Sequence, residues 1–116
     1  MKGDDIAQRL LGFAVQVLHV LCKLPKTPEA QHIVRQLSRC ATAPGAHCEE
    51  ARGAESRPDF IHKLKIADKE MRESRYWLRV IQHAELAPEL DLQVLIDEAS
   101  QLVAILTASA KTAAQR

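Results

Sequence analysis

The chain has 116 residues, of which 47% are hydrophobic but only 3% are aromatic, and its net charge is +1. This length suffices for a single domain (residues 1–116) with one core and is too short for two. Leu, Ile, Val and Ala must build that core, as in helix bundles rather than sandwiches, and the near balance of charge excludes a protein that attracts phosphate over its whole surface.

The three cysteines and the amino terminus indicate a cytoplasmic protein. Cys22, Cys40 and Cys48 are odd in number and lack CxxC spacing, so we interpret them as small buried hydrophobes in a reducing compartment. Acidic residues near the start, Asp4 and Asp5, argue against a signal peptide. No apolar run approaches the roughly 20 residues that span a bilayer, so no membrane association is expected.

The first predicted helix covers residues 4–23 and is apolar over an unusually wide arc. Its apolar residues are Ile6, Leu10, Leu11, Phe13, Val15, Val17, Leu18, Val20 and Leu21. At about 100° per residue they fill roughly 200° of the helix surface, whereas one packing stripe needs about 100°. Either this helix is buried within the chain, or its second apolar face, with Leu11, Val15 and Leu18, meets another copy of the protein.

The second predicted helix covers residues 28–55, with Thr27 as its N-cap and Pro28 at its first position. Its middle, residues 40–46, is a run of small residues that contains Pro44 and Gly45. Small side chains let a neighbouring helix approach closely, and the proline should kink the helix near Ala43. The alternative is two separate shorter helices.

The third predicted helix covers residues 58–86. Ser56 to Asp59 has the pattern of a capping box, with the Ser56 hydroxyl accepting from the backbone amide of Asp59. Residues at steps of three and four predict the buried stripe: Phe60, Leu64, Ala67, Met71, Ser74 and Leu78. Trp77 lies beside this stripe, where it either covers the edge of the core or anchors a subunit contact.

The same helix has a basic stripe on its other side. Its residues are Lys65, Lys69, Arg72, Arg75 and Arg79. Residues 57–79 hold seven basic and four acidic side chains, a local excess of three positive charges. This stripe is either a phosphate-binding face or an ordinary solvated face with interleaved acids, such as Asp68 four residues before Arg72.

The fourth predicted helix covers residues 89–112. Its expected core stripe is Leu92, Leu95, Ile96, Ala99, Leu102, Val103 and Leu106. Val94 and Ile105 point elsewhere, so we expect them at an oligomer interface together with the surplus face of the first helix. Three short connections predict an all-α, antiparallel up-and-down four-helix bundle.

Patterns that carry catalysis or metal binding are missing from the sequence. There is no phosphate loop, dinucleotide fingerprint, nucleophile elbow or HExxH helix. Neighbouring residues such as His47 and Glu49 point in different directions on a helix and cannot close on one ion. We therefore predict no enzyme activity, no cofactor and no metal.

Several segments of the chain resemble a known family. They are Gln36 to Arg39, Thr42, Pro44, Glu49 to Ala51, Ala54 to Ala67 and Lys69 to Leu78. Together they cover about half the chain and resemble the bacterial four helix bundle protein family, also called the 23S ribosomal RNA intervening-sequence protein family. The chain departs from that family at Ala46, where an asparagine is usual, and at Cys40, where serine or alanine is usual.

The resemblance implies more than the residue patterns do. It implies an antiparallel four-helix bundle, a relationship to the accessory protein of diversity-generating retroelements, and a ring-shaped homopentamer without established enzymatic activity. It also implies nucleic acid, RNA or DNA, as a partner, which the basic stripe would bind. The alternative is a structural or protein-interaction ring that does not bind nucleic acid.

Overall fold

The computed structural model describes residues 2–116, with side chains from Asp5 onward, and these residues form four helices without strands. The helices are α1 (Lys2–Leu21), α2 (Pro28–Arg52), α3 (Arg57–His83) and α4 (Gln93–Ala114). The molecule measures 47 × 23 × 19 Å. The longest helix, of 27 residues, spans about 40 Å of that length at a rise of about 1.5 Å per residue. The all-α four-helix bundle is therefore confirmed.

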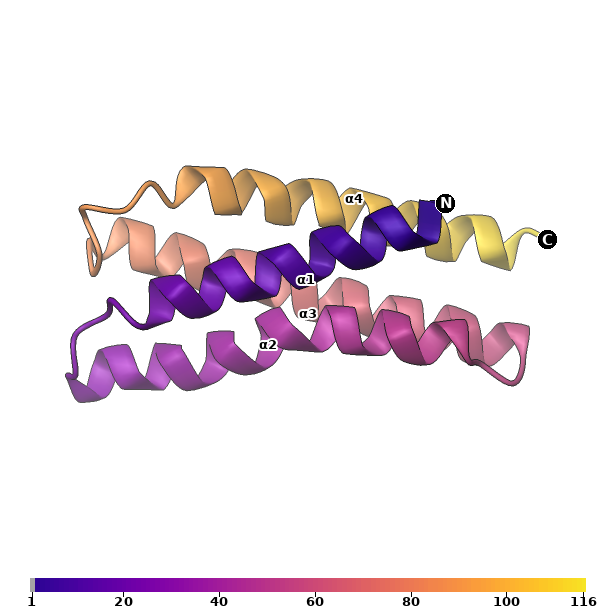
Figure 1. The fold of residues 1–116 in the computed structure, drawn as a ribbon, viewed down its shortest axis with the longest axis horizontal. Helices are drawn as coiled ribbons and strands as arrows, with labels where there is room; N and C mark the ends of the chain where they lie inside the picture. The colour runs from indigo at the N-terminus through magenta and orange to yellow at the C-terminus, as the bar shows by residue number, and fades with distance from the viewer. Residues whose placement is uncertain (1) are drawn as a thin grey trace.

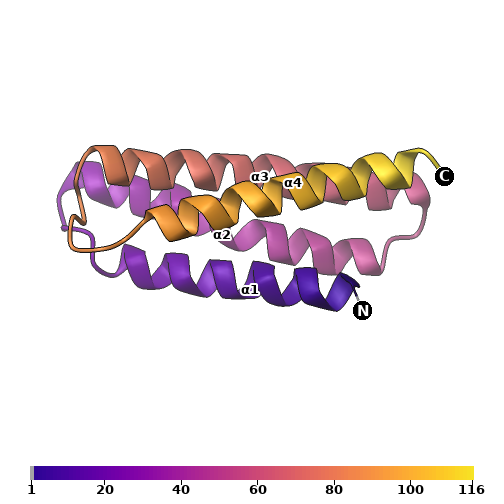
Figure 2. The ribbon, with the colours of Figure 1, turned by 90° about the horizontal axis from the view of Figure 1, so that it is seen from above.

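Each helix packs against two neighbours, so that the four occupy the corners of a bundle (Figure 1). Over the described residues α1 packs against α2 and α4, and α3 packs against the same two, whereas no Cα atoms of α1 and α3 lie within 8 Å of each other. Figure 2 shows the two chain ends at the same end of the bundle. Hydrogen bonds from Gln82 to Gln93, Arg75 to Ser100 and Arg72 to Thr107 are nested along α3 and α4. Nested contacts of this kind belong to two helices that run in opposite directions.

Both predicted N-caps are present. The Thr27 hydroxyl oxygen accepts from the backbone N–H of Ala30 at 3.2 Å, and the Ser56 hydroxyl oxygen accepts from that of Asp59 at 3.2 Å. Each cap residue has an extended backbone, which redirects the chain into the helix. α2 ends at Arg52 rather than at residue 55 as predicted, and the backbone N–H of Gly53 there bonds to the Glu50 carbonyl at 3.1 Å.

The end of α3 and the start of α4 differ from the prediction. α3 stops at His83 rather than at residue 86, since Glu85 adopts a left-handed φ of 56° and the Leu86 N–H bonds to the Ile81 carbonyl. α4 begins at Gln93 rather than at residue 89. The intervening loop buries Ala87 against the core, and the Asp91 carboxylate accepts from the backbone N–H of Gln93.

The predicted core stripes are buried in the structure. α3 buries Leu64, Ala67, Met71, Ser74 and Leu78, while Phe60 at its start is half-buried. All the core residues predicted for α4 are buried: Leu92, Leu95, Ile96, Ala99, Leu102, Val103 and Leu106. Ser74 is the buried polar residue of the core, and its hydroxyl donates to the Glu70 carbonyl one turn earlier at 2.9 Å.

α2 runs through Pro44 as one continuous helix, so the alternative of two shorter helices was wrong. Pro44 is buried and supplies no N–H to the carbonyl of Cys40. A Cβ added at Gly45 would lie 3.7 Å from the Cβ of Leu10 on α1. The run of small residues therefore lets α1 cross α2 closely, whereas the kink near Ala43 stays a prediction.

Candidate nucleic-acid interface

The outward surface of α3 carries a stripe of cations. Taking Lys65 as the reference and 100° per residue, six positions from Lys65 to the end of α3 lie within about 40° of one line along the helix. They are Lys65, Lys69, Arg72, Tyr76, Arg79 and His83, and all six are exposed. We call this set the α3 stripe. It contains no acidic residue. Two residues that were not predicted, Tyr76 and His83, lie on the same line as the predicted lysines and arginines.

The predicted basic residues are not equally available. Arg72 donates from Nε to Asp68 at 3.0 Å and from a terminal nitrogen to the Thr107 hydroxyl at 3.2 Å, so part of its hydrogen-bonding capacity is used. Arg75 lies about 80° off the stripe, is half-buried and donates to the Ser100 hydroxyl on α4. Arg75 therefore lies at the contact between α3 and α4 and not on the surface that carries the other four predicted basic residues.

Lys65, Lys69 and Arg79 keep their charge fully exposed. Over the described residues none of the three has a hydrogen bond or an ion pair with the protein. Their charged groups remain hydrated and can meet a phosphate without first breaking an internal contact. They are therefore the strongest anion-binding candidates in the α3 stripe.

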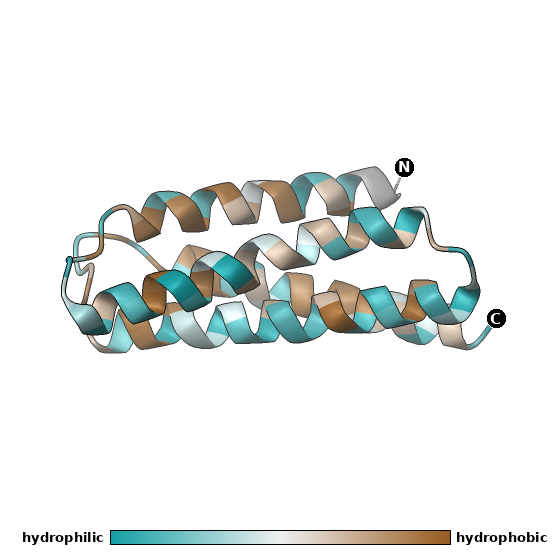
Figure 3. Cartoon of the chain, turned by 90° about the horizontal axis from the view of Figure 1, so that it is seen from below, coloured by the Kyte–Doolittle hydropathy of each residue, from teal (hydrophilic) through white to brown (hydrophobic). Residues whose placement is uncertain are grey.

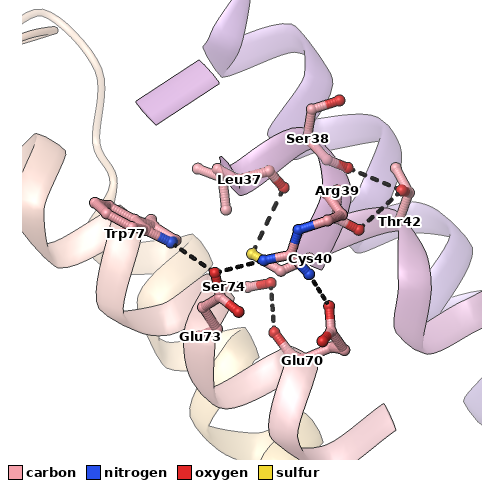
Figure 4. Close-up of polar contacts among 9 residues, drawn as sticks. All are labelled: Leu37, Ser38, Arg39, Cys40, Thr42, Glu70, Glu73, Ser74 and Trp77. Atoms are coloured by element: carbon pink, nitrogen blue, oxygen red, sulfur yellow. Dashed lines mark hydrogen bonds and ion pairs between the residues drawn. The ribbon is translucent and has the colours of Figure 1, made fainter. Parts of the chain in front are cut away.

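Two acids of α3, Glu70 and Glu73, pair with Arg39 on α2 (Figure 4), whereas Asp68 pairs with Arg72 of the stripe. The Arg39 guanidinium donates to Glu70 and to Glu73, each at 2.7 Å. These carboxylates raise the pKa of Arg39 further, mainly through the Glu73 hydrogen bond. Burial alone would raise the pKa of Glu73, but hydrogen bonds from Trp77 and Arg39 outweigh it and lower that pKa. Arg39 therefore forms ion pairs with both carboxylates on the α2 side of α3.

Trp77 covers the edge of the core, as one of its two predicted roles requires. It is half-buried, packs against the core, and donates from its indole nitrogen to the Glu73 carboxylate at 3.0 Å. The ring of His32 on α2 meets it edge to face at 5.8 Å, and the ring of Tyr76 does so at 5.1 Å. Trp77 is therefore held by its own contacts, and the exposed ring of Tyr76 packs against it.

A second exposed surface lies on α1 and is apolar. Leu11, Val15 and Leu18 are 57%, 43% and 40% exposed, and they recur at steps of four and three along one side of the helix. We call these three residues the α1 stripe. Brown, hydrophobic segments dominate the ribbon of α1 (Figure 3). Because α1 sits at a corner of the bundle, the chain itself leaves this predicted surplus face uncovered.

The stripe borders an apolar groove between α1 and α2. Small residues of α2 form its other wall, including Thr42, Gly45 and Ala46, with Glu49 at its side. The small side chains that let the helices cross closely therefore also leave a hollow next to Leu11 and Leu18. A helix from another molecule could insert into a surface of this shape.

The two predicted interface residues of α4 lie apart from the α1 stripe. Val94 is 61% exposed in a groove with Gly12 and Gln16, on the flank of α1 that faces α4. Ile105 is half-buried near the chain ends, where it lines a hollow with Ile6. The structure therefore does not join the five predicted interface residues into one patch.

The prediction of buried cysteines was right for Cys40 and wrong for Cys22, while Cys48 is half-buried. Burial raises the pKa of Cys40 to about 11, and it does the same for Cys48. Cys22 is exposed, because α1 ends at Leu21 and the chain turns there. Over the described residues no three His, Cys, Asp or Glu side chains gather where they could hold a metal ion.

The described helices are too short or too polar to cross a membrane. Fold and surface together define a small four-helix-bundle protein with one basic and one apolar exposed stripe. The chain belongs to the 23S rRNA-intervening sequence protein family, whose model matches residues 3–108.

A solved structure supports the same assignment. It is a protein of unknown function from the S23 ribosomal protein family of Bacteroides thetaiotaomicron, with 29% sequence identity and a TM-score of 0.83. The similarity covers 96% of this chain and 99% of that one. No curated protein matches the sequence.

Proposed function

We propose that this protein is a non-catalytic, self-associating bundle that binds structured RNA through the α3 stripe. The observation that carries the proposal is the row of exposed cations at Lys65, Lys69, Arg72 and Arg79, of which Arg72 alone has partners among the described residues. From Lys65 to Arg79 the row extends about 21 Å, enough for several successive phosphates of a nucleic-acid strand. The family's name connects such proteins with ribosomal RNA.

Self-association would supply the number of phosphate contacts that a single chain lacks. The net charge of +1 gives a single molecule little general attraction for RNA, so one stripe would bind weakly. Repeating the stripe on several linked copies raises the affinity without new contacts. The exposed α1 stripe favours a contact between copies, and the family resemblance favours a ring of five.

The second candidate is a structural or protein-binding ring without nucleic acid. The near-zero net charge favours it, as does the pairing of Arg72 with Asp68, which is typical of a solvated helix face. In that case the exposed cations of α3 would serve solubility only.

A filter-binding titration with 23S rRNA fragments at about 50 and about 200 mM salt separates the two candidates. Phosphate binding must weaken steeply as salt rises, by a slope of about 0.7 per contact for single strands. The double variant Lys69→Gln/Arg79→Gln should weaken retention and flatten this slope. Its matched control is Lys23→Gln/Lys26→Gln, which removes the same charge from the exposed turn after α1. Absence of RNA retention at low salt would refute RNA binding.

A further inference from the structure

We infer that Tyr76 is a stacking platform for an unpaired base, so that the α3 stripe selects single-stranded segments of RNA over duplex. The inference rests on the proposed function and specifies its ligand. Tyr76 is 59% exposed, although a large aromatic side chain is usually covered where the fold allows it. It lies in the middle of the α3 stripe, about 20° from the line through Lys65.

The ring of Tyr76 is held in place before any ligand arrives. It meets the Trp77 ring at a centroid distance of 5.1 Å and an interplanar angle of 72°. Trp77 is itself fixed by its hydrogen bond to Glu73 and by the ring of His32. A supported but exposed ring loses little conformational freedom when a base stacks on it, and this favours binding.

Cations flank the ring on both sides along the helix. Arg72 lies about 6 Å before Tyr76 along the helix axis and Arg79 about 4.5 Å after it. A base stacked on Tyr76 therefore has its own phosphates within reach of long, positively charged side chains. Alternating aromatic and basic residues along a strand path are the typical arrangement for single-stranded nucleic acid.

A duplex cannot use Tyr76 in this way. Paired bases are already stacked on each other, and the major groove of A-form RNA is too deep and narrow for side chains to read. A duplex would contact the Lys and Arg side chains of the α3 stripe only. The lysines of the stripe, Lys65 and Lys69, argue against a contact between copies on this surface, because lysine is depleted at protein–protein interfaces.

The test measures fluorescence anisotropy with a labelled single-stranded RNA of about 12 nucleotides and with the same strand in a blunt duplex. The full-length variants Tyr76→Ala and Tyr76→Leu should bind the single strand about 5- to 150-fold more weakly. Leu keeps an apolar contact with Trp77 but removes the ring, so it separates stacking from support. Tyr76→Phe should bind like the wild type, duplex binding should be unchanged in all three, and circular dichroism should show unaltered helix content.

Each other outcome counts against the inference in a distinct way. If the wild type binds neither RNA, the proposed function fails and this inference with it. If the wild type binds RNA and Tyr76→Leu loses nothing, or loses single strand and duplex equally, only the inference fails. If Tyr76→Leu lowers the molar mass of the RNA-free protein, Tyr76 belongs to a contact between copies instead.

Discussion

Leu18→Glu should dissociate the proposed oligomer without unfolding the subunit. Leu18 is 40% exposed at the border of the groove between α1 and α2, so a carboxylate at this position stays hydrated in the monomer. Glu has nearly the helix propensity of Leu, so α1 should persist. In a contact between copies the carboxylate would lose its water, and Glu49 of α2, which lines the same groove, would add repulsion.

The size of the effect follows from how much of the α1 stripe is still exposed. Fully burying a Leu or Val side chain stabilises by about 1.5–3 kcal/mol. Leu11, Val15 and Leu18 are roughly half exposed, so each has about 1 kcal/mol left to gain in an interface. Leu18→Glu removes the contribution of one leucine to the interface, about 1 kcal/mol, and adds a cost of about 2 kcal/mol or more for removing the carboxylate from water. Together these weaken association by about 100-fold.

Sedimentation velocity from about 1 to about 100 µM is the assay. The wild type should sediment as an oligomer and Leu18→Glu as a species near the 12.9 kDa of one chain, with equal helix content by circular dichroism. Gln16→Glu is the matched control, since it makes the same charge change on the flank of α1 that faces α4. Two results would refute the reasoning: a wild type that is monomeric at the highest concentration, or equal molar masses for Leu18→Glu and Gln16→Glu.

Three further predictions concern the described contacts. Ser56→Ala removes the N-cap of α3 and should cost about 1 kcal/mol of unfolding free energy, measured by urea denaturation. Of the three thiols, Cys22 should react fast with Ellman's reagent at about pH 8, whereas burial protects the other two until the protein is unfolded. The pKa of Glu73 is lower in the folded protein than in the unfolded chain. The ionised carboxylate therefore stabilises the fold fully above the pKa of the unfolded chain, and this stabilisation is lost as the pH falls through the pKa of the folded protein. Arg39→Ala should therefore cost about 1 kcal/mol at about pH 7 and less at about pH 3; an equal cost at both would contradict this.

The sequence was most informative where a local rule decides the structure. The caps at Thr27 and Ser56 follow from side-chain chemistry within three residues, and the buried stripes follow from helical periodicity. The end of α3 was harder to predict, because a non-glycine residue, Glu85, takes the left-handed position that usually marks a helix end. The start of α4 depends on burial of Ala87, which is a tertiary effect.

In the candidate interface, too, local spacing could be read from the sequence whereas contacts between helices could not. Spacing placed Lys65, Lys69, Arg72 and Arg79 on one side of α3, but it also included Arg75, which the structure turns toward α4. The ion pairs of Arg39 with Glu70 and Glu73 could not be predicted from the sequence, because they join residues 31 and 34 positions apart. Tyr76 was missed as a stripe residue, although its place at about 100° per residue could have revealed it.

The positions of the two exposed stripes make the two proposed roles compatible. α1 and α3 occupy opposite corners of the bundle, and within the described residues none of their Cα atoms lie within 8 Å of each other. A contact that pairs the α1 stripes of two copies would therefore leave the α3 stripe of both uncovered. Acidic residues elsewhere on the surface keep the net charge at +1, so copies do not strongly repel each other as they assemble. A row of cations on a molecule with almost no net charge thus suits both proposed steps, association of the copies and binding of a polyanion.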